Sequence, residues 1–315
     1  MIEAIALTKC YGPRRAVDDL SFTVRSGRVT GFLGPNGAGK SSTLRMLLGL
    51  VRPTSGRALV GGAEFASRPR GLRRAGALLD AQDVHGGRSG RAHLAALARG
   101  NRIPAGRVGE VLELVGLGAA ADRRIGDYSL GMKQRLGIAG ALLGDPPVLL
   151  FDEPLNGLDP QGVRWLRGLL RQWAAEGRTV FFSSHMMAEM AHTADHLVVL
   201  GRGRLLADEP LAAFAARGAA VRVEVAAPGL ARLLPLLAAE GAHLDPEDPG
   251  GLGGPDGPDR CTVSGLPAAR IGELALRAGL VLHRLAELPS ALEQVFVELT
   301  DGHAEHRAVA GGELR

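Results

Sequence analysis

Short apolar runs alternate with longer amphipathic stretches from the start of the chain to about residue 216. The runs typical of strands are Ser21–Val24, Val29–Leu33, Val148–Phe151, Thr179–Ser183 and His196–Leu200. The stretches typical of helices are Ser41–Leu50, Arg91–Ala98, Arg107–Val115, Met132–Leu143, Gly162–Glu176 and Met186–Ala194. A strand that is apolar throughout, such as Val148–Phe151, is typical of a sheet buried on both faces. The alternation therefore predicts an α/β domain over residues 1–216 with a mainly parallel sheet.

The pattern changes beyond Arg217. Polar and apolar residues alternate over Val221–Val225, and Leu230–Ala239 has helical spacing. A Pro/Gly/Asp-rich loop follows at 245–259, before the shorter strand-like or helix-like pieces Cys261–Val263, Ala268–Ala278 and Leu280–Leu285 and the amphipathic stretch Ser290–Leu299. We expect a small α+β accessory domain over residues 217–300 and a disordered tail over 301–315.

Composition excludes several classes of protein. Of 315 residues 46% are hydrophobic and 22% are charged, as in a soluble globular protein. No apolar run exceeds about eight residues, far short of the roughly 20 that span a bilayer, so the chain is not expected to cross a membrane by itself. Two distant cysteines predict neither a disulfide framework nor a metal site. The basic stretch 68–74 lacks aromatic residues between its arginines, so no nucleic-acid partner is expected.

A phosphate-binding loop is indicated by GPNGAGKSS at residues 34–42, which matches G-x-x-x-x-G-K-[ST]. Its glycines let backbone N–H groups surround phosphate oxygens, and the helix that follows directs its positive dipole end at them. Lys40 adds a full charge, and the Ser41 hydroxyl is a ligand for Mg²⁺. The loop predicts binding of a nucleoside triphosphate by Gly34, Pro35, Asn36, Gly37, Ala38, Gly39, Lys40, Ser41 and Ser42.

Two acidic residues follow the buried strand that ends at Phe151. This places Asp152 and Glu153 at the carboxyl edge of a parallel sheet, where α/β proteins bind their ligands. Asp152 suits a contact to Mg²⁺, and Glu153 suits the orientation and polarisation of an attacking water. The pair predicts hydrolysis of the bound nucleotide.

Six segments in order carry a resemblance to a known family. They are Tyr11, GPNGAGKSS, YSLGMKQR (128–135), LLFDEP, NGLD (156–159) and SSH (183–185). Together they resemble the ATP-binding subunit of ABC transporters, and more narrowly the multidrug and antibiotic-resistance export branch of the daunorubicin-resistance kind. The resemblance extends from residue 2 to about 215, and SALEQVFVELT (290–300) is similar to the terminal helix of that branch. It implies a P-loop NTPase fold with a helical subdomain, ATP and Mg²⁺ as ligands, and ATPase activity.

The resemblance also implies roles for single residues. Tyr11 would stack on adenine, and His185 would contact the γ-phosphate and the attacking water. Asp159 would lie in the loop that links two nucleotide sites. A signature segment would face the γ-phosphate held by a partner protomer, and it consists of Ser129, Leu130, Gly131 and Met132.

The chain departs from the family pattern at three places. Leu130 and Met132 stand where the common signature LSGGQ has glycine and glutamine, and Asn156 replaces the usual serine. The loop that normally holds a Mg²⁺-contacting glutamine reads GALLDAQDVHGG. Alignment on the preceding strand puts Asp80 at that position, whereas residue type favours Gln82, and both alternatives stay open.

One phosphate-binding loop and one signature segment occur in the chain. The resemblance therefore implies a homodimer that binds two ATP molecules head to tail, docked by a groove around residues 80–100 on a separate membrane permease. It implies a peripheral protein at the cytoplasmic face of a bacterial membrane, engaged in drug or antibiotic efflux. The alternative is a soluble ABC-type ATPase acting on DNA or ribosomes. That alternative requires a coiled-coil insertion or a second cassette, and the interval of about 90 residues before the signature shows no sustained heptads.

Overall fold

The computed structural model describes residues 1–67, 69–217, 222–244, 259–288 and 292–300. It divides into two compact units, one formed by Met1–Leu211 with the chain from Phe296 on, the other by Ala212–Val295. The second half of the stretch 290–300 thus groups with the larger unit, whereas we expected all of it in the accessory domain. The expected disordered tail 301–315 and nearly all of the loop 245–259 lie outside the described residues. Each unit is described by itself.

A six-stranded sheet forms the centre of the larger unit, with the order β5-β6-β7-β3-β8-β9. The strands are β3 (Val29–Leu33), β5 (Gly76–Leu78), β6 (Val148–Phe151), β7 (Thr179–Ser184), β8 (His196–Gly201) and β9 (Arg204–Pro210). All neighbours are parallel except β8 and β9. Every residue of β3, β6, β7 and β8 is buried, which explains why these strands are mostly apolar, and β6 entirely so.

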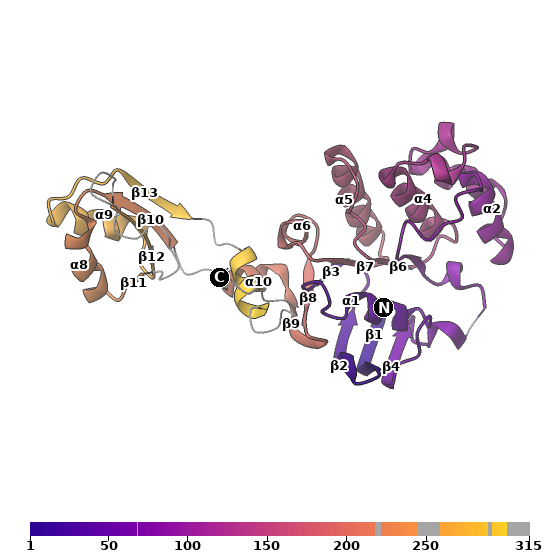
Figure 1. The fold of residues 1–315 in the computed structure, drawn as a ribbon, viewed down its shortest axis with the longest axis horizontal. Coiled ribbons are helices and arrows are strands. Elements are labelled where there is room, and N and C mark those ends of the chain that lie inside the picture. Colours follow the sequence, from indigo (N-terminus) through magenta and orange to yellow (C-terminus); the bar gives the residue numbers. More distant parts are fainter. Residues whose placement is uncertain (68, 218–221, 245–258, 289–291, 301–315) are drawn as a thin grey trace, which may run out of the picture. The chain divides into compact units, whose positions relative to one another are not determined.

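A second sheet, antiparallel and three-stranded, lies on one side of the first (Figure 1). Its strands are β1 (Ile2–Tyr11), β2 (Arg14–Val24) and β4 (Ser55–Val60), in the order β2-β1-β4. Helix α1 (Lys40–Leu47) packs on all three of these strands, and β2 also contacts β7 and β9 of the first sheet directly. The sequence predicted only the end of β2. Strand β1 escaped prediction because it bears charged residues, is partly exposed and is interrupted by register shifts, so its apolar residues do not alternate regularly.

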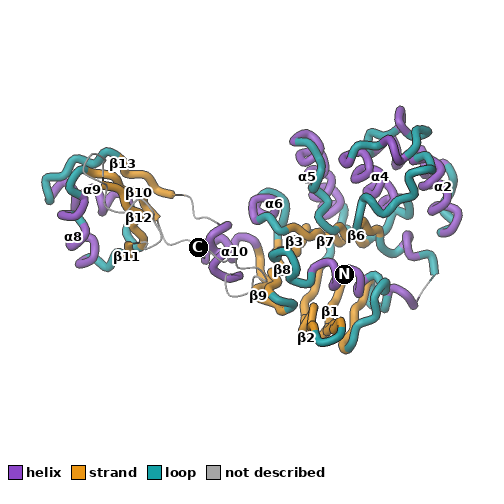
Figure 2. The backbone as a smooth tube through the Cα atoms, in the orientation of Figure 1, coloured by secondary structure: helices purple, strands orange, loops and turns teal. Residues whose placement is uncertain are grey.

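Helices cover the opposite side of the six-stranded sheet, where Figure 2 shows α5 and α6 above β3 and β7. The helices of this unit are α2 (Gly90–Gly100), α3 (Gly106–Leu114), α4 (Leu130–Leu142), α5 (Pro160–Ala175) and α6 (Met187–Ala191). Helix α7 (Leu211–Arg217) follows β9 and, apart from Leu211, belongs to the smaller unit. Short 3₁₀ helices occur at Phe65–Ser67, Gly71–Arg73, Gly118–Ala120 and Ile125–Asp127. Helices α2, α3 and α4 pack on one another as the helical part of the unit. The predicted α/β fold with a mainly parallel sheet is confirmed.

The helices differ from their predicted bounds by one to three residues at either end, and for two of them the structure shows a local reason. Helix α4 begins two residues before Met132, because the Ser129 hydroxyl caps it by accepting a hydrogen bond from the Met132 amide at 3.2 Å. Helix α6 ends at Ala191 instead of Ala194. The chain must turn there to enter β8, and the Asp195 carboxylate accepts a hydrogen bond from the Val29 amide at 2.8 Å.

The smaller unit has an antiparallel sheet of order β11-β12-β10-β13. Its elements are β10 (Arg222–Ala227), α8 (Leu234–Ala239), β11 (His243–Leu244), β12 (Asp259–Ser264), α9 (Ala268–Arg277) and β13 (Arg284–Leu288), with a 3₁₀ turn at Leu230–Arg232. Helix α10 (Leu292–Thr300) crosses the boundary between the units in sequence. Val223, Val225 and Val263 form a core with apolar residues of both α8 and α9. The α+β character expected of this region is confirmed.

Among the residues that the structure describes, every helix is too short or too polar to span a membrane.

Three phenylalanine rings join the two sheets of the larger unit. Phe22 of β2 lies 5.6 Å from both Phe32 of β3 and Phe181 of β7, whose own ring centroids are 4.9 Å apart. All three side chains are buried. Replacing Phe181 with alanine leaves a cavity at this junction, so we expect Phe181→Ala to lower the free energy of unfolding by about 3–5 kcal/mol, measured by urea denaturation.

The matched control is Leu50→Ala, because the Leu50 side chain is 66% exposed. Its expected effect is within about 0.5 kcal/mol. Equal effects of the two substitutions would contradict a central role for the ring cluster.

Candidate nucleotide-binding and catalytic site

The loop between β3 and α1 requires glycine at particular positions. Gly37 and Gly39 have φ angles of 82° and 102°, which L-residues with side chains rarely adopt. A Cβ atom on Gly39 would lie 2.4 Å from the Ala16 carbonyl oxygen, and one on Gly34 would lie 2.7 Å from the Leu200 carbonyl oxygen. The loop is thus pressed against β2 and β8, and α1 begins at Lys40 with its amino end open to the loop.

A cavity of about 490 Å³ lies in front of this loop. It is lined by residues 35–42, by Tyr11 and by the two carboxylates of Asp152 and Glu153. Gly34 is not part of the lining, although its carbonyl oxygen accepts a hydrogen bond from Lys40. The structure therefore brings together three segments that are far apart in sequence and that were predicted to meet at one nucleotide.

The cavity is also lined by three residues that sequence analysis did not identify. Arg14 and Ala16 enter from β2, and Leu79 follows β5. Arg14 pairs with Tyr11 across the β1–β2 turn. A sequence analysis that recognised this hairpin would therefore have placed Arg14 beside Tyr11. The Tyr11 ring is 46% exposed, and the Lys9 ammonium lies 5.0 Å from its centroid.

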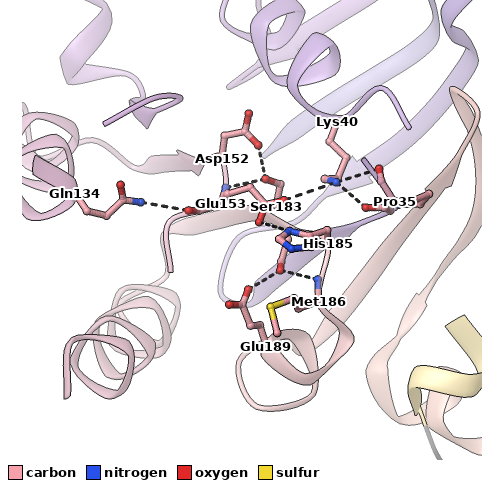
Figure 3. Close-up of polar contacts among 11 residues, drawn as sticks. Pro35, Lys40, Gln134, Asp152, Glu153, Ser183, His185, Met186 and Glu189 are labelled. Atoms are coloured by element: carbon pink, nitrogen blue, oxygen red, sulfur yellow. Dashed lines mark hydrogen bonds and ion pairs between the residues drawn. The ribbon is translucent and has the colours of Figure 1, made fainter. Parts of the chain in front are cut away.

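Lys40 is buried, with 6% of its surface exposed. Its ammonium donates hydrogen bonds to the carbonyl oxygens of Gly34 at 2.6 Å and Pro35 at 3.3 Å, and it lies 3.7 Å from Glu153 Oε1 (Figure 3). Burial lowers the pKa of Lys40, and the Glu153 and Asp152 carboxylates offset part of that effect. The site thus holds a desolvated cation next to its phosphate-binding loop.

Glu153 has an unusual backbone conformation. Its φ of 47° places a non-glycine residue in the left-handed region. The Ser183 hydroxyl accepts a hydrogen bond from the Glu153 amide at 2.9 Å and donates one to Asp152 Oδ1 at 2.5 Å. The Gln134 amide donates to the Glu153 carbonyl oxygen at 3.2 Å. Such conformations persist where surrounding contacts hold them, and they cluster at functional sites.

His185 lies on the other side of the Glu153 carboxylate from Lys40. His185 Nδ1 is 3.0 Å from Glu153 Oε2, while Lys40 approaches Oε1 (Figure 3). The residue before it, Ser184, donates a hydrogen bond to Glu189 Oε2 at 2.5 Å and accepts one from the Met186 amide at 3.0 Å. Burial raises the pKa of Glu189, with the Ser184 hydrogen bond opposing and the Glu153 charge adding to that effect.

Four polar residues near the carboxylates were absent from the predicted site, namely Gln134, Ser183, Ser184 and Glu189. Three of them were visible in sequence as letters of the motifs YSLGMKQR and SSH. Spacing alone did not assign them a contact, because their partners lie on other elements.

The signature segment lies against the linking loop 156–159 and contributes no lining to the cavity of its own chain. Leu130 is 45% exposed, and a Cβ on Gly157 would lie 2.4 Å from Leu130 Cδ2. A Cβ on Gly131 would lie 3.1 Å from the Gly157 carbonyl oxygen. Asp159 caps α5 by accepting a hydrogen bond from the Gly162 amide at 2.7 Å. The amino end of α4 is therefore exposed at Leu130. It also packs on the linking loop at Gly157, where the Cβ of any other residue would collide with the Leu130 side chain.

Asp80 and Gln82 are both exposed, and neither lines the cavity. Asp80 Oδ1 accepts a hydrogen bond from the Gln82 amide at 2.8 Å, so the two residues form one turn. The structure therefore does not choose between Asp80 and Gln82 as the counterpart of the Mg²⁺-contacting glutamine.

Within the described residues there is no group of three or more His, Cys, Asp or Glu side chains able to hold a metal. Ser41 and Asp152 supply a hydroxyl and a carboxylate to one cavity. This donor set fits Mg²⁺, which takes few protein oxygens and completes its shell with water and substrate phosphates.

Comparisons with known proteins identify the family of the chain. Residues 17–156 match the ABC transporter family model, and residues 219–293 match a domain of unknown function (DUF8746). The chain is 42% identical to a bacitracin transport ATP-binding protein of Bacillus licheniformis, over 67% of this chain and 70% of that protein. It is 35% identical to Nod factor export ATP-binding protein I of Burkholderia orbicola, over 93% of this chain and 94% of that protein.

Similar solved structures include an ATP-binding subunit of an ABC transporter, 26% identical, with a TM-score of 0.63 over 69% of this chain and 92% of that one. A dimeric ATP-binding cassette bound to ADP and Pi has a TM-score of 0.62 at 23% identity, covering 67% of this chain and 99% of that one, and it shares the fold. The family indicated by the sequence motifs is confirmed.

The contact of Gly39 with β2 generates a prediction. An alanine there combines a disfavoured φ with a clash against backbone, so the loop must shift away from its phosphate-binding form. We expect Gly39→Ala to weaken ATP binding by at least about tenfold, measured by titration with a fluorescent ATP analogue.

Gly109→Ala in α3 is the control, because a Cβ on Gly109 meets nothing within 4 Å. It should bind ATP as the unmodified protein does. Unchanged affinity in a folded Gly39→Ala variant would argue against the phosphate-binding role of the loop.

Proposed function

Because the chain belongs to the ATP-binding subunits of ABC transporters, it binds and hydrolyses ATP, and we propose that it powers antibiotic or drug export through a separate membrane permease. The observation that carries the catalytic part is the Glu153 carboxylate, held between the Lys40 ammonium and the His185 ring at the wall of the cavity. The export part rests on relatives whose names refer to bacitracin transport, lantibiotic transport and Nod factor export.

In this proposal the phosphate-binding loop holds the triphosphate by its backbone N–H groups and by Lys40. The Lys40 ammonium leaves the carbonyl oxygens of its own loop for the phosphate oxygens, which are charged and therefore stronger acceptors. Tyr11, exposed at the cavity rim, stacks on the adenine ring.

Glu153 is the residue that orients and polarises the attacking water. One carboxylate oxygen faces Lys40 and the other faces His185, so its lone pairs lie where the γ-phosphate and a water would meet. His185 contacts the same water and the γ-phosphate. Ser41 and Asp152 would hold Mg²⁺, which supplies charge neutralisation to the phosphates when bound.

A second copy of the chain completes each site. The signature segment does not line its own cavity, and the exposed amino end of α4 points its dipole at solvent. A partner's bound γ-phosphate is an anion that suits this helix end. Two copies arranged head to tail would place each signature segment, Ser129–Met132, over the ATP of the other copy, with Asp159 in the loop between the sites.

The permease is a separate protein. We place the ATPase at the cytoplasmic face of the membrane, peripherally attached, with the permease docked near residues 80–100. The exposed turn at Asp80 and Gln82 adjoins Leu79, which lines the cavity, so a partner on this surface would lie close to the nucleotide. The rival function, a soluble ATPase acting on DNA or ribosomes, is not favoured by any contact in the described residues.

The assignment of Glu153 predicts a separation of binding from hydrolysis. Glu153→Gln keeps the size and most hydrogen bonds of the side chain and removes its charge, so ATP affinity is retained while kcat falls by about 100-fold or more. Phosphate release and equilibrium nucleotide binding measure the two effects. Glu110→Gln, on the exposed side of α3, is the control and should hydrolyse at the normal rate. Near-normal turnover of Glu153→Gln would remove Glu153 from this role.

The permease proposal predicts a stoichiometric membrane partner. The tagged Glu153→Gln protein, purified from detergent-solubilised membranes of its own host with ATP and Mg²⁺, should bring down one multi-helix membrane protein that mass spectrometry identifies. Omission of ATP is the control for nucleotide-dependent assembly. Recovery of ribosomal proteins or DNA without a permease would favour the soluble alternative.

A further inference from the structure

Two buried polar side chains contact the two peptide groups of Glu153, one on each side. The Ser183 hydroxyl, fully buried on β7, accepts a hydrogen bond from its amide. The Gln134 amide, buried on α4, donates to its carbonyl oxygen. We propose that Ser183 and Gln134 are positioning residues, which hold Glu153 in its left-handed conformation and thereby direct its carboxylate between Lys40 and His185. The proposal rests on the proposed role of Glu153 in hydrolysis.

The backbone of Glu153 needs such support because its φ of 47° is disfavoured for a residue with a Cβ atom. The direction of the Cα–Cβ bond depends on this φ. If the segment relaxed to a negative φ, the side chain would swing away, and its carboxylate would lose the positions 3.7 Å from Lys40 Nζ and 3.0 Å from His185 Nδ1. The geometry of the carboxylate is therefore maintained by contacts to the main chain as well as by its own ion pairs.

Ser183 is suited to this task because a hydroxyl both accepts and donates. It accepts from the Glu153 amide and donates to Asp152 Oδ1, so a single buried oxygen sets the spacing of both consecutive acidic residues (Figure 3). Ser183 itself is fixed by the parallel pairing of β7 with β3, where its register partner is Phe32. An alanine at this position would leave the Glu153 amide, which belongs to a half-buried residue, without this acceptor.

Gln134 supports the carbonyl side of Glu153 from another element. It lies in the second turn of α4, whose cap is Ser129, and 5% of its surface is exposed. The same helix also contacts the chain four residues after Glu153, where Leu130 packs against Gly157. Helix α4 thus holds the segment that follows β6 at two points, and one of them is the peptide group of Glu153.

The test first compares four single variants of the full-length chain and then a double variant with Glu153→Gln. Ser183→Ala removes the acceptor, Ser183→Thr retains a hydroxyl, and Gln134→Leu removes the donor at similar size. Thr30→Val is the matched control, since the Thr30 hydroxyl is buried in the neighbouring strand β3 and has no hydrogen-bond partner in the described structure. ATP affinity is measured in EDTA, so that Mg²⁺ binding at Asp152 does not contribute, and kcat is measured from phosphate release with Mg²⁺.

We expect kcat to fall about 100-fold in Ser183→Ala and about tenfold in Gln134→Leu, with ATP affinity in EDTA unchanged within about twofold, because misplacing a reacting group affects turnover more than binding. Ser183→Thr should recover most of the lost kcat, and Thr30→Val should be normal. In the double variant Glu153→Gln/Ser183→Ala, single-turnover hydrolysis should be no slower than in Glu153→Gln alone, because Ser183 acts through the Glu153 carboxylate.

Three results would overturn the proposal. The first is a kcat within threefold of normal in both Ser183→Ala and Gln134→Leu. The second is a parallel loss of turnover, ATP affinity and thermal stability that Thr30→Val shares, which would indicate a structural role only. The third is a further loss in the double variant, which would place the effect of Ser183 on Asp152. If Ser183→Ala does not fold, Gln134→Leu alone decides the question. Normal turnover of Glu153→Gln would instead be a failure of the proposed function.

Discussion

The parallel pairing of β6, β7 and β3 is the constraint on which the site depends. Parallel strands present their carboxyl ends at one edge, so the loops after Phe151, Ser184 and Leu33 must lie side by side. Those loops carry the two acidic residues, His185 and the phosphate-binding loop. Hydrogen bonds along completely buried strands leave little freedom to slide, because a shift in register would change every contact of this edge together. The strand register of the sheet thus fixes the relative positions of the residues at the site.

Burial gives this edge its electrostatic character. Lys40 is almost inaccessible to water, and desolvation lowers its pKa even though two carboxylates are near. The two oxygens of the Glu153 carboxylate contact Lys40 and His185, so the buried Lys40 cation has a compensating anion beside it. A triphosphate brings new negative charge to Lys40 and to the amino end of α1. Lys40 and Glu153 form an ion pair at 3.7 Å at the wall of the cavity that we propose to hold this triphosphate.

Leu130 shows how the departure from the common signature is accommodated. The family pattern has glycine here, and the sequence alone presented leucine as a loss of backbone freedom. In the structure Leu130 adopts ordinary helical geometry at the start of α4, and its side chain packs on Gly157, which has a φ of 76° and no Cβ. One glycine is replaced in the signature segment, and another in the linking loop makes room for its side chain.

The sequence by itself determined the parts of the protein that are local. Glycine at fixed positions before Lys40 specifies a phosphate-binding turn, and an apolar run before Asp152 specifies a buried strand, because backbone conformation and burial depend on neighbouring residues. It missed β1 and β4, whose charged and half-exposed residues are held by pairing between strands: β1 pairs with the next strand, β2, and with β4 at residues 55–60.

Only the tertiary structure decided the contacts of Ser183 and Gln134 with Glu153, 30 and 19 residues away in sequence. A hydrogen bond between distant elements depends on how those elements pack, and the order of residues along one segment carries no record of that distance.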